Sequence, residues 1–312
     1  MSSRVCVCAV LLALAAGCEK KEPATPKETP APAVTSAVKK AAPTAPSASV
    51  AAEPTVNAPD AVPFEMPNGE LSAKAGEFVL TPTRNAIDEA LEIGGDKQTF
   101  IYYGAHLERP GPTASVVKTL SGRVLTIPNL LILPVGPKVT AKPGDVLLTA
   151  WASGSGLQRA IVVEGGTPEK PKVRYLDMTL DNPSGWGEKV DQLPEGSFGV
   201  LDKPGAVGTT VACSDKSRVL RWIRVAANAD QILGLGFAGK MKALAAKDCE
   251  NVPVVPKVKA GDAVRVPTLG AFVPGKVSKV DAAIGRVWVK FQVGGDDREE
   301  AVGFTNVAGP AK

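Results

Sequence analysis

Four Lys-x-Gly triplets punctuate the chain beyond its proline-rich start, and their spacing constrains the fold more than any other feature. The triplets, the only four in the sequence, are Lys74-Ala75-Gly76, Lys142-Pro143-Gly144, Lys203-Pro204-Gly205 and Lys259-Ala260-Gly261, with glycines 68, 61 and 56 residues apart. A short apolar run follows each of them. Because glycine allows the tight turn that leads a chain into a strand, the pattern predicts four small β units of similar length.

The last unit shows the clearest strand pattern. Its expected strands are Gly261–Val266, Lys276–Val280, Arg286–Gln292 and Glu300–Val307. Val287, Val289 and Phe291 alternate along the third of these, so they should share one buried face. The run GDAV…GAFVPGKVSKVD…GRVWVKF…EEAVGF, within residues 259–307, resembles the SH3-like and Tudor-type small β-barrels. That resemblance implies a barrel of four or five short strands.

The earlier units fit the same template less closely. Strands are expected at Asp145–Trp151, Gln158–Glu164 and Lys172–Asp177 in the second unit, and at Thr99–Tyr103, Ala114–Thr119 and Arg123–Ile127 in the first, with a short helix at Asn85–Ile93. Frequent glycine and proline between short apolar strands predict an all-β fold, organised as tandem SH3-like or Tudor-like small barrels. The predicted units span residues 71–138, 139–202, 203–257 and 258–312. Whether 203–257 is an independent barrel or an elaboration of the second unit stays open.

The N-terminus is typical of a secretory signal. Arg4 precedes an apolar run of 12 residues, Val5–Ala16, which is shorter than the roughly 20 residues of a spanning helix. The following Ala15-Ala16-Gly17-Cys18 resembles the lipobox of bacterial lipoproteins, although leucine is the commonest residue where Ala15 stands. The resemblance implies removal of residues 1–17 and lipidation of Cys18. In proteobacterial lipoproteins, aspartate at the position after the lipidated cysteine tends to retain the protein in the inner membrane. The resemblance therefore implies that this chain, which has Glu19 there, is anchored in the outer membrane, on its periplasmic or surface side.

Residues 18–70 are expected to form a disordered linker. Positions 19–70 hold 10 of the 27 prolines, 12 alanines and one aromatic residue, too little apolar surface to offset the entropy of ordering. Such a linker would tether the β units to the membrane. Residues 71–312 carry 30 basic and 25 acidic side chains without a basic block, which argues against nucleic-acid binding.

Two of the five cysteines remain in the mature β region. Cys6 and Cys8 would leave with the signal, and Cys18 would be lipidated. Cys213 and Cys249 are therefore an even pair in an oxidising compartment, and the sequence predicts a disulfide between them.

The possible catalytic and cofactor-binding motifs in the sequence each lack a residue or an element that their function needs. Gly234–Gly239 matches the dinucleotide fingerprint G-x-G-x-x-G, but only Ile232-Leu233 precede it where a full strand is needed, so a glycine-rich strand and turn is the preferred interpretation. A helix is conceivable at Lys240–Lys247. Met241 replaces the hydroxyl residue of a P-loop, and His106 is the only histidine. We therefore expect no enzyme, no cofactor and no metal site.

The few aromatic residues are the candidate binding residues. They are Trp151, Tyr175 and Trp186 in the second unit, and Phe272 and Trp288 in the fourth. The Tudor-type resemblance implies that such residues could form a cage for a cationic group, but packing in a small-barrel core or between domains is the preferred interpretation of each. The expected function is that of an envelope lipoprotein whose β modules bind a cell-wall component (peptidoglycan) or a protein partner. A structural subunit of an envelope complex and an envelope hydrolase are the alternatives, and the oligomeric state stays open.

Overall fold

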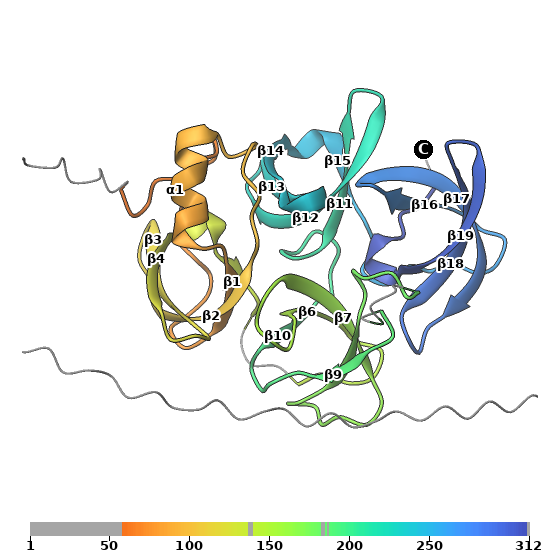
Figure 1. Cartoon of the computed structure of the whole chain (residues 1–312), viewed down its shortest axis with the longest axis horizontal. Coiled ribbons are helices and arrows are strands. Elements are labelled where there is room, and N and C mark those ends of the chain that lie inside the picture. Colours follow the sequence, from red (N-terminus) through yellow and green to blue (C-terminus); the bar gives the residue numbers. More distant parts are fainter. Residues whose placement is uncertain (1–57, 137–139, 182–184, 186, 311–312) are drawn as a thin grey trace, which may run out of the picture. The chain divides into compact units, whose positions relative to one another are not determined.

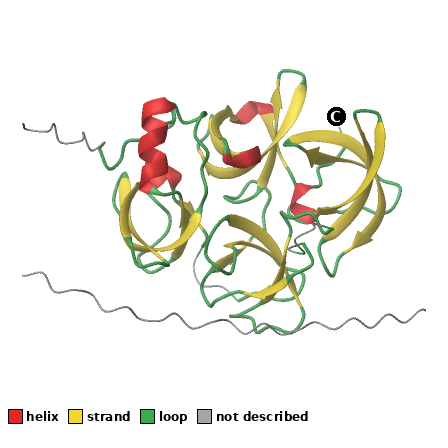
Figure 2. Ribbon diagram, viewed as in Figure 1, coloured by secondary structure: helices red, strands yellow, loops and turns green. Residues whose placement is uncertain are grey.

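Short antiparallel strands make up most of the protein, and the all-β prediction is confirmed (Figures 1 and 2). The computed structural model describes residues 58–136, 140–181, 185 and 187–310, which belong to one compact unit beginning at Thr55. The predicted signal peptide, Cys18 and most of the predicted linker lie outside the described residues. In the described ranges, no helix is both long and apolar enough to cross a bilayer.

The first sheet is a meander whose fifth strand returns to its first. Its strands are β1 (Phe78–Thr81), β2 (Tyr103–Arg109), β3 (Ala114–Thr119), β4 (Val124–Pro128) and β5 (Leu133–Pro134). Their order in the sheet is β4-β3-β2-β1-β5, and every pairing is antiparallel. The helix α1 (Arg84–Ile93) lies between β1 and β2 in the chain, and its N-cap residue Thr83 accepts a hydrogen bond from the Ala86 backbone N–H at 3.3 Å.

The second sheet repeats this topology. Its strands are β6 (Val146–Ala150), β7 (Leu157–Val163), β8 (Lys172–Tyr175), β9 (Val190–Gln192) and β10 (Phe198–Val200). Their order is β10-β6-β7-β8-β9, so the fifth strand again pairs with the first. Its own apolar cluster includes Leu147, Val173 and Phe198.

The third and fourth segments repeat the topology twice more. The third consists of β11 (Thr210–Asp215), β12 (Arg218–Ala227), β13 (Gln231–Leu235), β14 (Met241–Ala245) and β15 (Cys249–Asn251), and the fourth of β16 (Ala263–Thr268), β17 (Ala271–Asp281), β18 (Arg286–Val293) and β19 (Asp296–Gly303). β15 returns to β11, and in the fourth segment Ala308 takes the fifth position by pairing with Arg265. A single pairing of Leu220 with Ala271 joins the two segments into one nine-stranded sheet.

One turn type leads into each first strand. In three segments a lysine carbonyl accepts the backbone N–H three residues later, and the carboxylate of that later residue accepts the lysine N–H in return; the pairs are Lys74–Glu77, Lys142–Asp145 and Lys259–Asp262. The glycine before each carboxylate has a positive φ of 87°, 89° or 95°, as a type II turn requires. The internal repeat is therefore present in the backbone as well as in the sequence.

The third segment departs from the predicted position of this turn. Its equivalent turn is Ala206–Thr209, where Gly208 has φ 84° and its N–H bonds to the Arg224 carbonyl at 2.7 Å, as Gly144 bonds to Val162. The predicted Lys203–Ala206 is a separate turn that comes just before it. The prediction from Lys203-Pro204-Gly205 therefore placed the start of this segment three residues too early.

Most predicted elements lie where the sequence placed them. β3 matches Ala114–Thr119 at both ends, α1 begins one residue before Asn85, and Val287, Val289 and Phe291 are all buried. The predicted strand Thr99–Tyr103 is wrong: Thr99 makes only an isolated bridge to Lys240, and β2 begins at Tyr103. The possible helix at Lys240–Lys247 is also wrong, because Met241–Ala245 pairs with β13 as the strand β14.

The predicted disulfide is confirmed. Cys213 and Cys249 are directly paired across β11 and β15 and are covalently bonded. Cys213 is buried in a small apolar cluster with Val211, Trp222 and Ile232. The bond therefore links the first and fifth strands of the third segment.

Candidate functional site

Trp151 and Tyr175, two of the predicted binding aromatics, come together in the second segment. Their ring centroids are 4.2 Å apart. Tyr175 is fully buried, and its hydroxyl accepts the backbone N–H of Ala152 at 3.0 Å. Burial raises the pKa of Tyr175 above its ordinary value. The pair packs on the core of this segment, and the predicted third member, Trp186, lies outside the described residues.

Trp288 and Phe272 lie apart in the fourth segment. Trp288 is half-buried on β18, where it is paired with Lys279 of β17, whose Nζ lies 4.5 Å from the indole centroid. This lysine already supplies the cation that an aromatic face attracts. Phe272 is buried against Ala212, Val252 and Ala308. The two rings therefore do not form one cage.

The glycine-rich stretch Gly234–Gly239 is a strand end and a turn, as preferred from the sequence. β13 ends at Leu235, and a 3₁₀ turn covers Phe237–Gly239. A Cβ at Gly236 would lie 2.6 Å from a ring carbon of Trp222. Glycine is needed here because the indole packs on the backbone, which is a structural reason for the motif.

The polar residues that could carry catalysis are scattered. His106 packs edge-on against Phe78 with ring centroids 5.6 Å apart. Among the described residues, no three histidine, cysteine, aspartate or glutamate side chains gather as a metal site would require. The hollows of the surface are therefore the remaining candidate sites.

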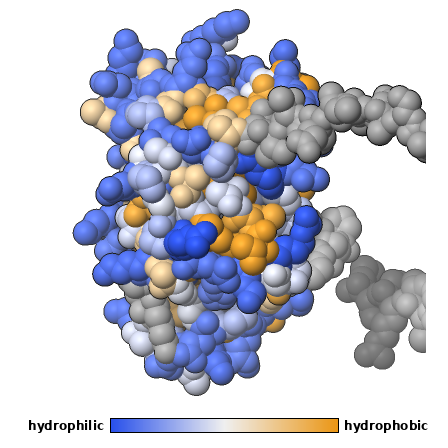
Figure 3. Space-filling model, turned by 90° about the vertical axis from the view of Figure 1, so that its left-hand side faces the viewer, coloured by the Kyte–Doolittle hydropathy of each residue, from blue (hydrophilic) through white to orange (hydrophobic). Residues whose placement is uncertain are grey.

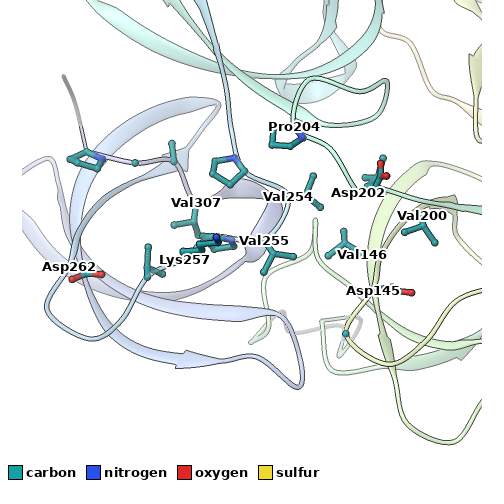
Figure 4. Close-up of a pocket in the computed structure, with 18 of the residues that line it drawn as sticks. Asp145, Val146, Val200, Asp202, Pro204, Val254, Val255, Lys257, Asp262 and Val307 are labelled. Carbon is teal, nitrogen blue, oxygen red and sulfur yellow. The ribbon is translucent and has the colours of Figure 1, made fainter.

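One hollow of the surface is a groove of about 860 Å³, within the size range of ligand sites. One side comes from the second segment, with Val146 and Val200, and the other from the fourth, with Val307 (Figure 4). The connecting segment 252–258 supplies Val254 and Val255 between them. Val255 is 47% exposed, a large apolar side chain left open at the surface.

Proline and valine dominate the walls of this groove. Its prolines are Pro204, Pro253, Pro256 and Pro310. Two of them interrupt the connecting segment, where they remove backbone donors and prevent strand pairing. The segment therefore forms no strand and bends at Val254 and Val255, and its side chains line the groove. No aromatic residue is among the residues that line it.

The charged residues of the groove are few. Asp145, Asp202, Asp262 and Lys257 line it, a balance of three acids to one base. Asp145 and Asp262 are the carboxylates of two of the repeated turns, each fixed by one backbone N–H at 2.9 Å. Two entry turns of the repeat therefore meet at one groove, which the sequence pattern alone did not indicate.

A buried ionic network lies outside the groove and links three segments. Asp177, just after β8, accepts hydrogen bonds from Arg159 of β7 and, at 2.9 Å, from Arg221 of β12. Asn306 of the fourth segment accepts from both arginines, at 2.9 and 2.7 Å, and Arg159 also donates to Thr210. Arg159 is 0% exposed, so its charge is neutralised inside the protein.

The pKa of Asp177 reflects this network. Burial alone would raise the pKa of the carboxyl, but the charge and hydrogen bonds of Arg159, and then the charge of Arg221, hold it well below its usual range. Asp177 is thus ionised under all ordinary conditions. The network holds the segments together and gives no sign of acid–base chemistry.

Sequence reasoning missed both the groove and the network. The run Val252–Val258 (VPVVPKV) was available as a signal, since apolar residues broken by proline cannot be a central strand. Arg159 in the middle of the apolar run Leu157–Val163 was another. No protein-family model matches the chain, and comparison with curated proteins finds no significant match.

Proposed function

We propose that this protein is a non-enzymatic, lipid-anchored binding protein of the bacterial cell envelope. In this proposal residues 1–17 are removed, Cys18 carries the lipid, and residues 18–70 tether four SH3-like modules to the outer membrane. The repeated strand order, with a fifth strand returning to the first, supports the SH3-like assignment. A 3₁₀ turn before the fifth position in the first, third and fourth segments supports it further.

The ligand of the groove is proposed to be an extended segment of a protein partner. The single observation that carries this choice is the wall of valine and proline, which offers apolar contact and few hydrogen-bonding groups. A peptidoglycan strand is less well matched, because sugars need many polar partners and usually an aromatic face. The excess of aspartate over lysine favours a partner segment that carries a basic residue.

A peptide titration tests the groove. The probe is a fluorescent N-acetyl-Lys-Pro-Val-Pro-Val-amide, and its counterpart carries glutamate in place of lysine. The full-length chain should bind the lysine peptide saturably and more tightly. Val255→Asp should weaken binding about tenfold or more, because it places a charge in an apolar wall. Val190→Asp, a change at another exposed valine, serves as the matched control.

Two outcomes would contradict the proposal. Equal binding of the two peptides, or binding unaffected by Val255→Asp, would remove the groove from the function. Saturable co-sedimentation with peptidoglycan sacculi that Trp151→Ala or Trp288→Ala weakens would instead favour wall binding. Anchoring is tested separately by fatty-acid labelling, which Cys18→Ala should abolish.

A further inference from the structure

A second, smaller hollow lies between the second, third and fourth segments. It has a volume of about 250 Å³ and shares no lining residue with the groove. Phe237 and Leu269 line it together with Arg221, Arg286 and Asp177. Apolar and cationic groups therefore meet in one small cavity, which we call the arginine pocket.

Two of the side chains that line the arginine pocket are apolar and exposed. Phe237 is 56% exposed and Leu269 is 81% exposed. A Cβ on Gly270 would lie 2.7 Å from that of Phe237, which places the two loops against each other. Leu269 and Gly270 form a two-residue hairpin loop closed by the pair Thr268–Ala271, and both have positive φ, 46° and 82°.

This hairpin loop favours asparagine or glycine at the position of Leu269. A leucine there is disfavoured by its backbone conformation and by its exposure to water. Strained residues of this kind persist where the surroundings impose them, and they concentrate at ligand-binding sites. Leu269 belongs to none of the apolar core clusters of the described residues.

Arg286 is a buried cation at the arginine pocket, and backbone carbonyls hold its guanidinium group. Arg286 is 1% exposed, and its guanidinium donates only to the backbone carbonyls of Tyr175 at 2.7 Å and of Leu176 and Ala301 at 3.4 Å. Within the described ranges it forms no ion pair. A buried cation ordinarily has a carboxylate or other anion as its partner.

Asp177 forms ion pairs with two of the three arginines, and it acts on Arg286 only through its charge, as Asp181 also does. It is the one carboxylate bonded to both Arg159 and Arg221. Glu300 also lines the pocket but makes no ion pair with these arginines among the described residues. Burial lowers the pKa of Arg221 and of Arg286 to about 10, so both guanidinium ions lack part of the solvation that a bound anion would replace.

We propose that the arginine pocket binds an organic carboxylate with an apolar side group. The carboxylate would lie at Arg221 and Arg286, whose planar forks suit it, and the apolar group would lie between Phe237 and Leu269. A free carboxylic acid and the C-terminal residue of a polypeptide share this chemistry. The pocket volume of about 250 Å³ suits a small carboxylic acid or a single C-terminal residue.

Calorimetric titration of the full-length chain tests this proposal. The probes are N-acetyl-L-leucine, its neutral counterpart N-acetyl-L-leucinamide, the free acid 4-methylpentanoate, and inorganic phosphate. N-acetyl-L-leucine should bind saturably, with a dissociation constant on the order of 1 mM or below. The amide should bind at least about tenfold more weakly, because it lacks the charge. Comparison of N-acetyl-L-leucine with 4-methylpentanoate separates a peptide end from a free acid.

Substitutions at residues that line the arginine pocket test whether N-acetyl-L-leucine binds there. Leu269→Gly and Phe237→Ala should each weaken N-acetyl-L-leucine about tenfold, because they remove apolar contact at exposed positions without disturbing the core. Ile93→Ala, at an exposed isoleucine of α1, is the matched control. Arg286→Gln should abolish binding of N-acetyl-L-leucine. If this buried substitution unfolds the protein, Leu269→Gly and Phe237→Ala still test the proposal, because both positions are exposed.

Three results would overturn the proposal. They are no saturable binding of either carboxylate, equal binding of N-acetyl-L-leucine and its amide, and an affinity for N-acetyl-L-leucine that both loop variants leave unchanged. Binding of phosphate alone would replace the carboxylate by another anion and would equally refute it. Because Val255 belongs to the groove and not to this pocket, Val255→Asp should leave this titration unchanged, so each site can fail independently.

Discussion

Replacing Asp177 by asparagine should destabilise the protein severely. The change keeps the size of the side chain and one oxygen acceptor, but it leaves the buried guanidinium groups of Arg159 and Arg221 without their shared counter-ion. Removing one partner of a buried ion pair costs about 3–5 kcal/mol. For a unit of this size that loss corresponds to a fall in melting temperature of roughly 6–20 °C.

Urea denaturation followed by tryptophan fluorescence, with the disulfide intact, would measure the change in the free energy of unfolding. Asp181→Asn is the control, because this aspartate lies nearby in sequence but is exposed. It should change stability by no more than about 0.5 kcal/mol. If Asp177→Asn and Asp181→Asn had the same small effect, the network would not be the connection between segments that its geometry indicates.

The same experiment has a pH dependence with a definite sign. The pKa of Asp177 is held below the value of 3.8 that it would have in the unfolded chain. The unfolded state therefore takes up a proton first as the pH falls, and the stability that Asp177 contributes is present above about pH 4 and is progressively lost below it. Asp177→Asn should remove this part of the acid sensitivity, and an unchanged acid limb would refute the assignment.

Three further changes test other parts of the fold. Reducing the Cys213–Cys249 bond, which closes a 36-residue separation, should lower the free energy of unfolding by about 4 kcal/mol, measured by urea denaturation with and without reductant. Tyr102→Phe should cost at most about 1 kcal/mol near pH 7, since the Met241 sulfur, at 3.7 Å, is the one hydrogen-bond partner of its buried hydroxyl among the described residues. Because burial raises the pKa of Tyr102, the variant should lose less stability than the wild type as the pH rises past 10. Gly144→Ala should cost about 1 kcal/mol or more, because φ is 89° in the turn before β6, and a thermal melt that matches the wild type would rule out the type II turn.

The elements that could be predicted are those whose signal is local. The strand Ala114–Thr119 and the buried face of Val287, Val289 and Phe291 follow from alternation over a few residues. The disulfide follows from counting cysteines in an exported chain. Glycine turns marked three of the four segment starts correctly, because a positive φ before a strand is a local requirement.

The remaining features depend on residues far apart in the chain. Arg159 can be buried because Asp177, Thr210 and Asn306, which come from three segments, accept its hydrogen bonds. The residue pattern within one strand cannot predict hydrogen-bond partners that come from other segments. The groove was missed for the same reason, since Val255 gains its place only when the second and fourth segments lie on either side of the connecting segment.

The Asp177 network also bears on how such a chain can evolve. Tandem repeats commonly gain and lose copies by duplication and deletion, which is harmless when each copy makes the same contacts with its neighbours. Here Arg159 and Asp177 come from one copy, Arg221 from the next and Asn306 from the last. Loss of the second copy would leave Arg221 without its counter-ion, and loss of the third or the fourth would remove hydrogen-bond partners of the buried Arg159. These copies should therefore be inherited as a block of fixed number and order, whereas the network places no such constraint on the first copy, which contributes none of its residues.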